Sequence, residues 1–388
     1  MNCKQLSTLI NSALLPNRMN VNATALAEDL SNYVDVGQIL SSMQGTDLQD
    51  FQRMLAVGVR NMAVFDDVYD PDTYGIYKNV ENFGKAIQRV AIKNLPTVQD
   101  SHAINLVNGQ NYLDGKYYGA EFDSRIYIDT KTFKVSYSWS DDTWEKCVAD
   151  VDEMNTLLTQ WLNAVQSQLN NINKGIVDMT INKRIVDCLN NGKVVGLVSA
   201  YNAEFGTQES YTTIKADEAK ARRFSEFCTG VIRIIYRGLE EFDKKYNDGT
   251  VNVYTPSRRI SSIFLTQFVN DIQNYGLTTI FHNEELGLGK VYDKLSWQTS
   301  GTAMLPQYTT TGVIVDGDSQ SSQSSQTYGE TAPIVGIIFD NDSMGVTDKF
   351  NKITTEYIGS EGYTTYHHHV AVDNYTDGRG NGVVFTLG

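Results

Sequence analysis

The chain has 388 residues, 41% of them hydrophobic, which is enough for two packed domains or for one domain with long extensions. Its formal net charge is −14 and it has no run rich in Lys and Arg, which argues against specific binding of nucleic acid. Its four scattered cysteines are typical of a reduced, intracellular protein, and no apolar stretch reaches the roughly 18 residues of a membrane span.

The first 140 residues are expected to form helical and extended segments. Residues 1–64 are predicted to be a helical N-terminal arm. Residues 86–93 are predicted to be a strand, and residues 133–139 alternate strictly between apolar and polar. We therefore predict a two-stranded ribbon over 83–140. Because an isolated ribbon is only marginally stable in water, something outside it must cover the apolar face of its second strand, which consists of Phe133, Val135, Tyr137 and Trp139.

The middle of the chain is predicted to be helical. The longest helix is expected over 152–173, with a break or bend at Gly175 and a continuation of its apolar stripe to Leu189. A second helix is expected from Asp217 to about Phe242. A third is expected to open with a cap at 255–257 and to end at Gly276; its predicted buried positions are Ile260, Phe264, Phe268 and Ile272.

The end of the chain is predicted to be a series of strands. Residues 317–329 are polar and of low complexity, which predicts a surface loop, and the apolar runs 312–315 and 334–339 on either side of it are expected to pair in one sheet. Further strands are expected over 364–372 and 383–387. The order of elements predicts an α+β fold in which the two ends of one domain meet around an inserted second domain.

Candidate sites for catalysis or metal binding each lack a required residue. His367 and His369 share one face of a predicted strand and could chelate zinc, but a third ligand is missing, so packing explains them better. The Asp-rich segment 340–345 resembles a calcium loop but has Met344 and Asn351 at two ligand positions. The chain is therefore predicted not to be an enzyme and to need no cofactor or metal.

The order of these elements resembles the major capsid proteins of tailed bacteriophages, which have the Hong Kong 97 fold, over about residues 45–388. The C-terminal part carries the most specific similarity, because residues 334–345 look like the family's return strand and its aspartate-to-glycine turn. The other segments that carry the resemblance are 83–90, 133–139, the helix from Met154, residues 254–276, Trp297, Tyr357, 362–363, 366–369 and 383–385.

The resemblance implies a division of the chain. It implies an N-terminal arm over 1–64, an extended loop over 65–140, a peripheral domain with a long spine helix over 141–199 and 340–388, and an axial domain over 200–339. The apolar face of the ribbon would then find its partner on a neighbouring subunit, so Phe133, Val135, Tyr137 and Trp139 are the candidate intersubunit residues.

The resemblance also implies a function. It predicts a structural protein that assembles into pentamers and hexamers of an icosahedral-type shell around double-stranded phage DNA, with only non-specific proximity to that DNA. The expected partners are other copies of the chain, a separate scaffolding protein, a portal and decoration proteins. The expected location is the virion, after assembly in the host cytoplasm, without contact to a membrane.

Three alternatives remain open at this stage. An encapsulin, which is a bacterial compartment shell of the same fold, would be encoded beside a cargo enzyme. A metal-dependent enzyme would use His367 and His369 and would contain stoichiometric zinc. Another virion component, such as a tail protein or a minor shell protein, would form tubes or trimers.

Overall fold

The computed structural model describes residues 7–8, 10–11, 13, 25–42, 51, 73–78, 87–94, 121–127, 130–140, 151–275, 290–294, 313–316, 324–327, 334–358 and 362–388. The helices in these ranges are α2 (Tyr33–Ser42), α5 (Val151–Asn190), α6 (Leu197–Phe205), α7 (Tyr211–Ala216), α8 (Glu218–Gly238) and α9 (Thr266–Tyr275), with short 3-10 turns at Ser257–Arg259 and Asn341–Ser343. The strands are β1 (Ile87–Asn94), β2 (Glu121–Tyr127), β3 (Thr130–Ser140), β4 (Val194–Gly196), β5 (Ile260–Leu265), β6 (Lys290–Lys294), β7 (Val313–Asp316), β8 (Ser324–Thr327), β9 (Ile334–Asp340), β10 (Met344–Ile358), β11 (Tyr363–Thr376) and β12 (Gly382–Thr386).

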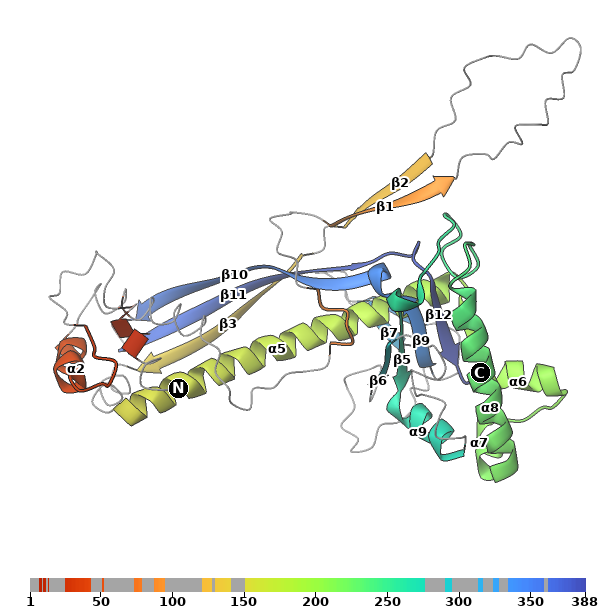
Figure 1. Cartoon of the computed structure of the whole chain (residues 1–388), viewed down its shortest axis with the longest axis horizontal. Coiled ribbons are helices and arrows are strands. Elements are labelled where there is room, and N and C mark those ends of the chain that lie inside the picture. The colour runs from red at the N-terminus through yellow and green to blue at the C-terminus, as the bar shows by residue number, and fades with distance from the viewer. Residues whose placement is uncertain are drawn as a thin grey trace, which may run out of the picture.

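The long helix α5 spans both halves of the elongated molecule (Figure 1). It has 40 residues and is about 60 Å long at a rise of about 1.5 Å per residue. Its apolar stripe is buried from Met154 to Val165 and from Ile176 to Ile185, and it is partly buried at Leu169 and Ile172 between them. The expected break at Gly175 is wrong, because the helix continues through this glycine. The spacing of the apolar residues on either side keeps one face buried, which outweighs the weak helix preference of a single glycine.

A three-stranded antiparallel sheet in the order β10-β11-β3 lies along the first half of α5. Its inner face packs on the helix through an aromatic cluster. The ring centroid of Trp161 on α5 lies 4.8 Å from that of Trp139 on β3 and 5.2 Å from that of Tyr366 on β11. The predicted strand over 364–372 is confirmed as part of β11.

A mixed five-stranded sheet in the order β4-β12-β9-β5-β6 lies beside the other end of α5, with α8 and α9 nearby (Figure 1). All of β9 is buried, as its continuous apolar run predicted. The predicted helix over 255–276 is wrong in its first half, because residues Ile260–Leu265 form strand β5 and helix α9 follows only from Thr266. Ile260, Phe264, Phe268 and Ile272 are buried as predicted, although the first two lie on a strand and the last two on a helix. Their spacing of four residues therefore did not distinguish a helix from a strand.

One expected sheet pairing differs from the structure. Strand β7, at residues 313–316, pairs with β8 and not with β9, and β8 lies inside the segment expected to be a polar loop. Strand β9 pairs instead with β12 on one side and with β5 on the other. The pattern of apolar residues shows that a strand is buried, but not which strand lies beside it.

Among the described residues, β1 and β2 form a two-stranded ribbon that projects from the body of the molecule (Figure 1). The expected return strand over 133–139 is β3, which instead pairs with β11 in the sheet above α5. The prediction of one ribbon over 83–140 is therefore wrong in its second strand. Most of the predicted helical N-terminal arm over 1–64 lies outside the described residues.

Candidate functional site

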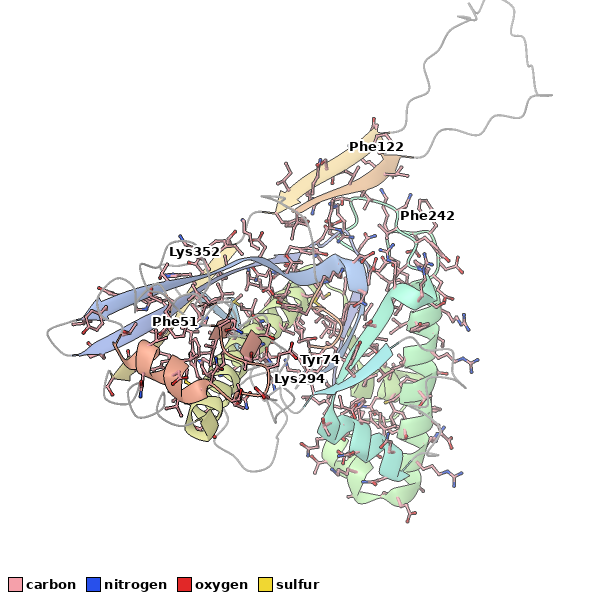
Figure 2. The ribbon with its side chains drawn as sticks, turned by 60° about the vertical axis from the view of Figure 1, so that its left-hand side comes forward. Phe51, Tyr74, Phe122, Phe242, Lys294 and Lys352 are labelled. Atoms are coloured by element: carbon pink, nitrogen blue, oxygen red, sulfur yellow. The ribbon has the colours of Figure 1, made fainter. Side chains whose placement is uncertain are left out.

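The ribbon has two chemically different faces because side chains alternate along a strand. The outer face carries Val90, Ile92, Phe122 and Ile126, which are 60%, 45%, 65% and 61% exposed. Ile92 lies directly opposite Phe122 across the two strands. Figure 2 shows Phe122 on the ribbon, away from the body of the molecule. A projecting ribbon with a single apolar face suits docking onto another protein surface.

The inner face of the ribbon carries charge and is half-buried. Arg89 lies on β1, while Asp123, Arg125 and Tyr127 lie on β2. Arg89 and Arg125 occupy directly opposite positions, so two positive charges face the body at one level of the ladder. Two like charges directly opposite each other destabilise a pair of strands unless anions lie nearby.

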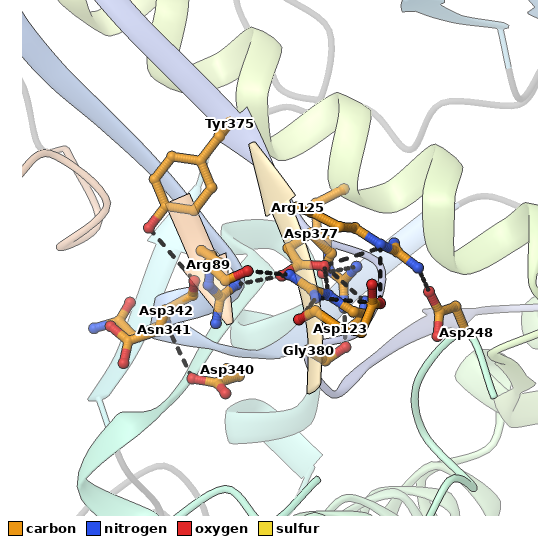
Figure 3. Close-up of polar contacts among 12 residues, drawn as sticks. Arg89, Asp123, Arg125, Asp248, Asp340, Asn341, Asp342, Tyr375, Asp377 and Gly380 are labelled. Atoms are coloured by element: carbon orange, nitrogen blue, oxygen red, sulfur yellow. Dashed lines mark hydrogen bonds and ion pairs between the residues drawn. The ribbon is translucent and has the colours of Figure 1, made fainter. Parts of the chain in front are cut away.

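Those anions come mainly from the turn Thr376–Gly382, which joins β11 to β12 and which we call the C-terminal turn (Figure 3). Asp377 is 2% exposed, and its carboxylate lies 3.2 Å from Nη1 of Arg89 and 3.9 Å from Nη1 of Arg125. A second carboxylate, on Asp248, lies 3.2 Å from Nη2 of Arg125. Asp248 is held to the same turn by a hydrogen bond from its backbone N–H to the carbonyl of Gly378.

Arg379 binds both strands of the ribbon from within the turn. Its Nη1 donates to the carbonyl of Asp123 at 2.8 Å and its Nη2 donates to the carbonyl of Arg89 at 3.1 Å. The same guanidinium donates to the Asp377 carboxylate, from Nε at 3.0 Å and from Nη2 at 2.9 Å. Arg379 is 2% exposed, so its bonds to the buried Asp377 carboxylate form away from water, where charge-assisted bonds are strongest.

The charges of this cluster shift two pKa values. Burial alone would raise the pKa of Asp377, but hydrogen bonds from Arg379 and the positive charge of Arg89 outweigh it and lower that pKa. Burial, followed by the charge of Asp377, raises the pKa of Tyr127 to about 12. Asp377 is therefore a carboxylate, and Tyr127 a neutral phenol, across the neutral pH range. The ring of Tyr127 lies 5.7 Å from that of Tyr375, which adds an aromatic contact between ribbon and body.

Helix α5 supports the C-terminal turn from the body. Arg184, near the C-terminal end of that helix, is 2% exposed. It donates from Nη1 to the carbonyl of Asp377 at 3.1 Å and from Nη2 to the carbonyl of Gly380 at 2.6 Å. A Cβ on Gly380 would overlap the side chain of Ser343, so this position requires the close approach that only glycine allows. The turn is thus fixed by the body on one side and binds the ribbon on the other.

The Asp-rich segment 340–345 lies next to this cluster and binds cations of the protein itself. Asp340 accepts from Nη2 of Arg259 at 2.6 Å, and Asp342 accepts from Nζ of Lys78 at 3.1 Å. Burial would raise the pKa of Asp342, but the hydrogen bond and charge of Lys78 lower it overall. The segment therefore has protein cations in the positions where a calcium ion was considered from the sequence.

The four predicted intersubunit residues lie elsewhere, on β3. Trp139 is 4% exposed and packs on Trp161, while Phe133 packs against the hydrophobic core and Val135 and Tyr137 are half-buried. The expectation that this face has no partner within its own subunit is wrong, because helix α5 covers it. Contact of these residues with a neighbouring subunit stays a prediction.

The two candidate zinc ligands are bonded to neighbouring strands. His367 lies 2.8 Å from Oγ of Ser136 and 3.4 Å from the carboxylate of Glu356, and His369 lies 3.0 Å from Oγ1 of Thr354. Over the described residues, no group of three His, Cys, Asp or Glu side chains is arranged to hold a metal ion. The two imidazoles thus act as hydrogen-bonding positions on the outer face of the three-stranded sheet.

The sequence did not identify Asp377, Arg379 or Arg184 as site residues. One signal was present, because the stretch from Asp377 to Gly382 places an arginine between glycines directly after a buried strand. Such a turn allows the backbone to approach other segments closely and allows the arginine to reach inward. The charged residues that alternate with apolar ones in β1 and β2 were a second signal of a ribbon with one polar face.

Comparison with known proteins identifies the family. The sequence profile described as Phi29-like phage major capsid protein matches residues 150–386, which is more than half of the 388-residue chain. The chain belongs to this family. It is a shell-forming structural protein of a phage and a component of the virion.

A solved capsid structure supports the Hong Kong 97-like fold of this capsid protein. A chain in the capsid structure of Staphylococcus phage Andhra is 12% identical, with a TM-score of 0.51 over 84% of this chain and 87% of that one. A chain from the structure of the head fibre and inner core protein gp22 of native bacteriophage P68 is 11% identical, with a TM-score of 0.45 over 84% of this chain and 88% of that one. No protein of curated function matches this sequence.

The predicted α+β fold and capsid function are thereby confirmed, and neither the encapsulin nor the metal-enzyme alternative finds support in these comparisons. Among the helices of the described residues, none has the length and apolarity required to cross a membrane.

Proposed function

We propose that the capsid protein assembles into pentamers and hexamers of a closed, icosahedral-type shell around double-stranded phage DNA. In this proposal the outer face of the ribbon docks on a neighbouring copy of the chain. The observation that carries it is the exposed apolar face of Val90, Ile92, Phe122 and Ile126 on a ribbon whose other face is fixed to the body. A closed shell of identical subunits offers each ribbon the same acceptor surface.

The energy of one such contact is modest. Complete burial of a large apolar side chain contributes about 1.5–3 kcal/mol. The four side chains are 45–65% exposed, so docking removes about half of each from water and contributes roughly 1 kcal/mol per residue. One contact is therefore reversible, which lets misplaced subunits dissociate, whereas a shell repeats the contact at every subunit.

The partners follow from the same proposal. A separate scaffolding protein, a portal and decoration proteins complete the particle, and assembly takes place in the host cytoplasm. The net charge of −14 supports proximity to the packaged DNA without specific binding to it. For the β3 residues, the proposed contact with a neighbour involves the half-buried Phe133, Val135 and Tyr137, which α5 leaves partly exposed, whereas Trp139 is buried against α5.

The test is to charge the outer face of the ribbon. The variant Val90→Asp with Ile126→Asp places two carboxylates where the docking surface is apolar, and these side chains are solvent-exposed, so the subunit is expected to fold normally. The expected result is a soluble subunit with the melting temperature of the wild type and no shells by electron microscopy. The matched control, Gln208→Asp with Thr212→Asp, adds the same charge at exposed positions remote in sequence and is expected to form shells. Normal shell yield from the ribbon variant would refute the proposal.

A further inference from the structure

The direction in which the ribbon leaves the subunit depends on the contacts between its inner face and the body. A two-stranded ribbon is only marginally stable by itself, so these contacts matter. Among the described residues, Arg89, Asp123 and Arg125 contact the body at neighbouring levels of the ladder (Figure 3). The Arg379 guanidinium donates to the carbonyl of Arg89 on β1 and to the carbonyl of Asp123 on β2. A single side chain thus holds both strands at one fixed spacing from the body.

Arg379 is itself held rigidly. Its Nε and Nη2 are bonded to the Asp377 carboxylate, and its backbone N–H donates to the same carboxylate at 3.0 Å. The carbonyls of Asp377 and Gly380 accept hydrogen bonds from Arg184 on α5. The N–H of Asp377 also donates to the carbonyl of Ser343 at 2.7 Å. Hydrogen bonds to the body therefore fix the C-terminal turn on both sides of Arg379, the residue that binds the ribbon.

We propose that Arg379 is the positioning residue of the ribbon, and that through the C-terminal turn and Arg184 it ties the direction of the ribbon to the long helix α5. The consequence for assembly rests on the proposed docking of the ribbon. A ribbon without a fixed direction would still expose its apolar face. Only a fraction of its orientations would fit the acceptor surface on the neighbouring copy, so docking would be weaker. A change in the tilt of α5 would be transmitted to the ribbon, because direct hydrogen bonds join α5 to the turn and the turn to both strands of the ribbon.

The chemistry of this link requires arginine. The planar guanidinium donates in several fixed directions at once, so it can bind one carboxylate and two carbonyls at the same time. A lysine at position 379 keeps the positive charge beside Asp377 but has one ammonium group on a flexible stem, which cannot reproduce the fork. The variant Arg379→Lys therefore keeps the positive charge but removes the hydrogen-bonding geometry, so it tests the two contributions separately. The surface pair of Arg125 and Asp248 is partly exposed and screened by salt, so it cannot replace the buried link.

The experiment measures the direction of the ribbon independently of assembly. Cys3 and Cys147 are replaced by Ser, while Cys188 and Cys228 are buried and stay unlabelled. Spin labels are placed at Ser124→Cys on the outer face of the ribbon and at Glu226→Cys on α8, in the full chain carrying Val90→Asp and Ile126→Asp. Pulsed electron resonance then gives the distribution of distances between ribbon and body. Shell yield is measured separately, without labels and with the ribbon face intact.

Three variants are compared with a control. Arg379→Lys and Arg379→Met are expected to at least double the width of the distance distribution and to lower shell yield about tenfold, as for the loss of one charge-assisted hydrogen bond. Arg184→Lys, which changes a residue bonded to the turn, is expected to widen the distribution as well. The control Arg222→Met removes an exposed guanidinium paired only across one helical turn with Glu226, so in shell assays it is expected to match the wild type.

The outcomes separate the positioning role from the proposed function. A narrow, unshifted distribution with normal shell yield in both Arg379 variants would overturn the positioning role and leave the docking proposal intact. A widened distribution in the Arg379 variants together with a normal shell yield would uphold the positioning role and count against the docking of the ribbon on a neighbouring copy. If the Arg379 variants do not fold, Arg184→Lys decides, and a narrow distribution in that variant overturns the link to α5.

Discussion

The buried ion pair between Lys294 and Asp178 gives a quantitative test of how α5 is joined to the five-stranded sheet. Lys294 ends β6 and is 3% exposed, Asp178 lies on α5 and is 4% exposed, and their charged atoms are 2.5 Å apart. Lys294 Nζ also lies 5.5 Å from the ring centroid of Tyr74, and Figure 2 shows these two residues together. Burial lowers the pKa of Lys294, while the charge of Asp178 opposes that shift.

We predict that Lys294→Met lowers the free energy of unfolding by about 3–5 kcal/mol at pH 7.5, because it leaves the Asp178 carboxylate buried without its cation. An unpaired buried carboxylate has a raised pKa in the folded state, so its proton stabilises that state at low pH and this stability is lost as the pH rises through the raised pKa. The difference between variant and wild type is therefore expected to shrink on going from pH 7.5 to about 5.

Urea denaturation followed by circular dichroism at both pH values measures this difference. The double variant Lys294→Met with Asp178→Leu removes both charges and is expected to recover most of the loss, because an apolar pair of similar volume replaces the ion pair. A single variant that is destabilised by less than about 1 kcal/mol, or a double variant no better than the single one, would refute this account of the contact.

Three further predictions concern the sheet above α5 and the ribbon. Trp139→Ala should destabilise the isolated subunit by about 3–5 kcal/mol in urea titrations, since its ring packs on α5; an undisturbed subunit that fails to assemble would instead favour a role between subunits. The pKa of Asp377 is lowered from the ordinary value of 3.8, so the stability it confers is complete above that value and is lost as the pH falls through the lower folded value; the ribbon distances should therefore be unchanged from pH 8 to about 5 and broaden only in stronger acid. Gly380→Ala should cost about 1–3 kcal/mol in thermal unfolding, because the added Cβ overlaps Ser343, and an unchanged melting temperature would show that the turn can move.

The long helix and the buried strand β9 could be predicted because their patterns are unambiguous. A stripe at spacings of three and four over 40 residues fits only a helix, and a short continuous apolar run fits a strand buried on both faces. The stretch from Ile260 to Ile272 was ambiguous between a helix and a strand. Residues four apart lie on the same face of a strand and also on the same face of a helix, so their spacing fits both. Ser261 and Ser262 are buried inside β5, although serine side chains are more often exposed.

Long-range pairing and the charged cluster could not be predicted from the local sequence. Strand β3 has the alternation of a half-buried strand, but that pattern fits β11 as a neighbour as well as it fits β1. Arg379 and Asp123 are 256 residues apart in the chain, so no local pattern connects them. Buried charged residues are uncommon without partners, and a sequence alone does not give those partners.

The alternation of the ribbon has a consequence for how capsids of this kind can diversify. Between Ile87 and Ile92 and between Phe122 and Tyr127, the exposed, outward side chains occupy even-numbered positions, such as 90, 92, 122 and 126, while the inward ones occupy odd-numbered positions, such as 89, 123, 125 and 127. Under the proposed docking and positioning roles, a substitution at an even position alters which surface the ribbon recognises, and one at an odd position alters where the ribbon points. In that case natural variation or engineering can adapt the ribbon to a new neighbouring surface by changing one set of residues while the other set stays constant.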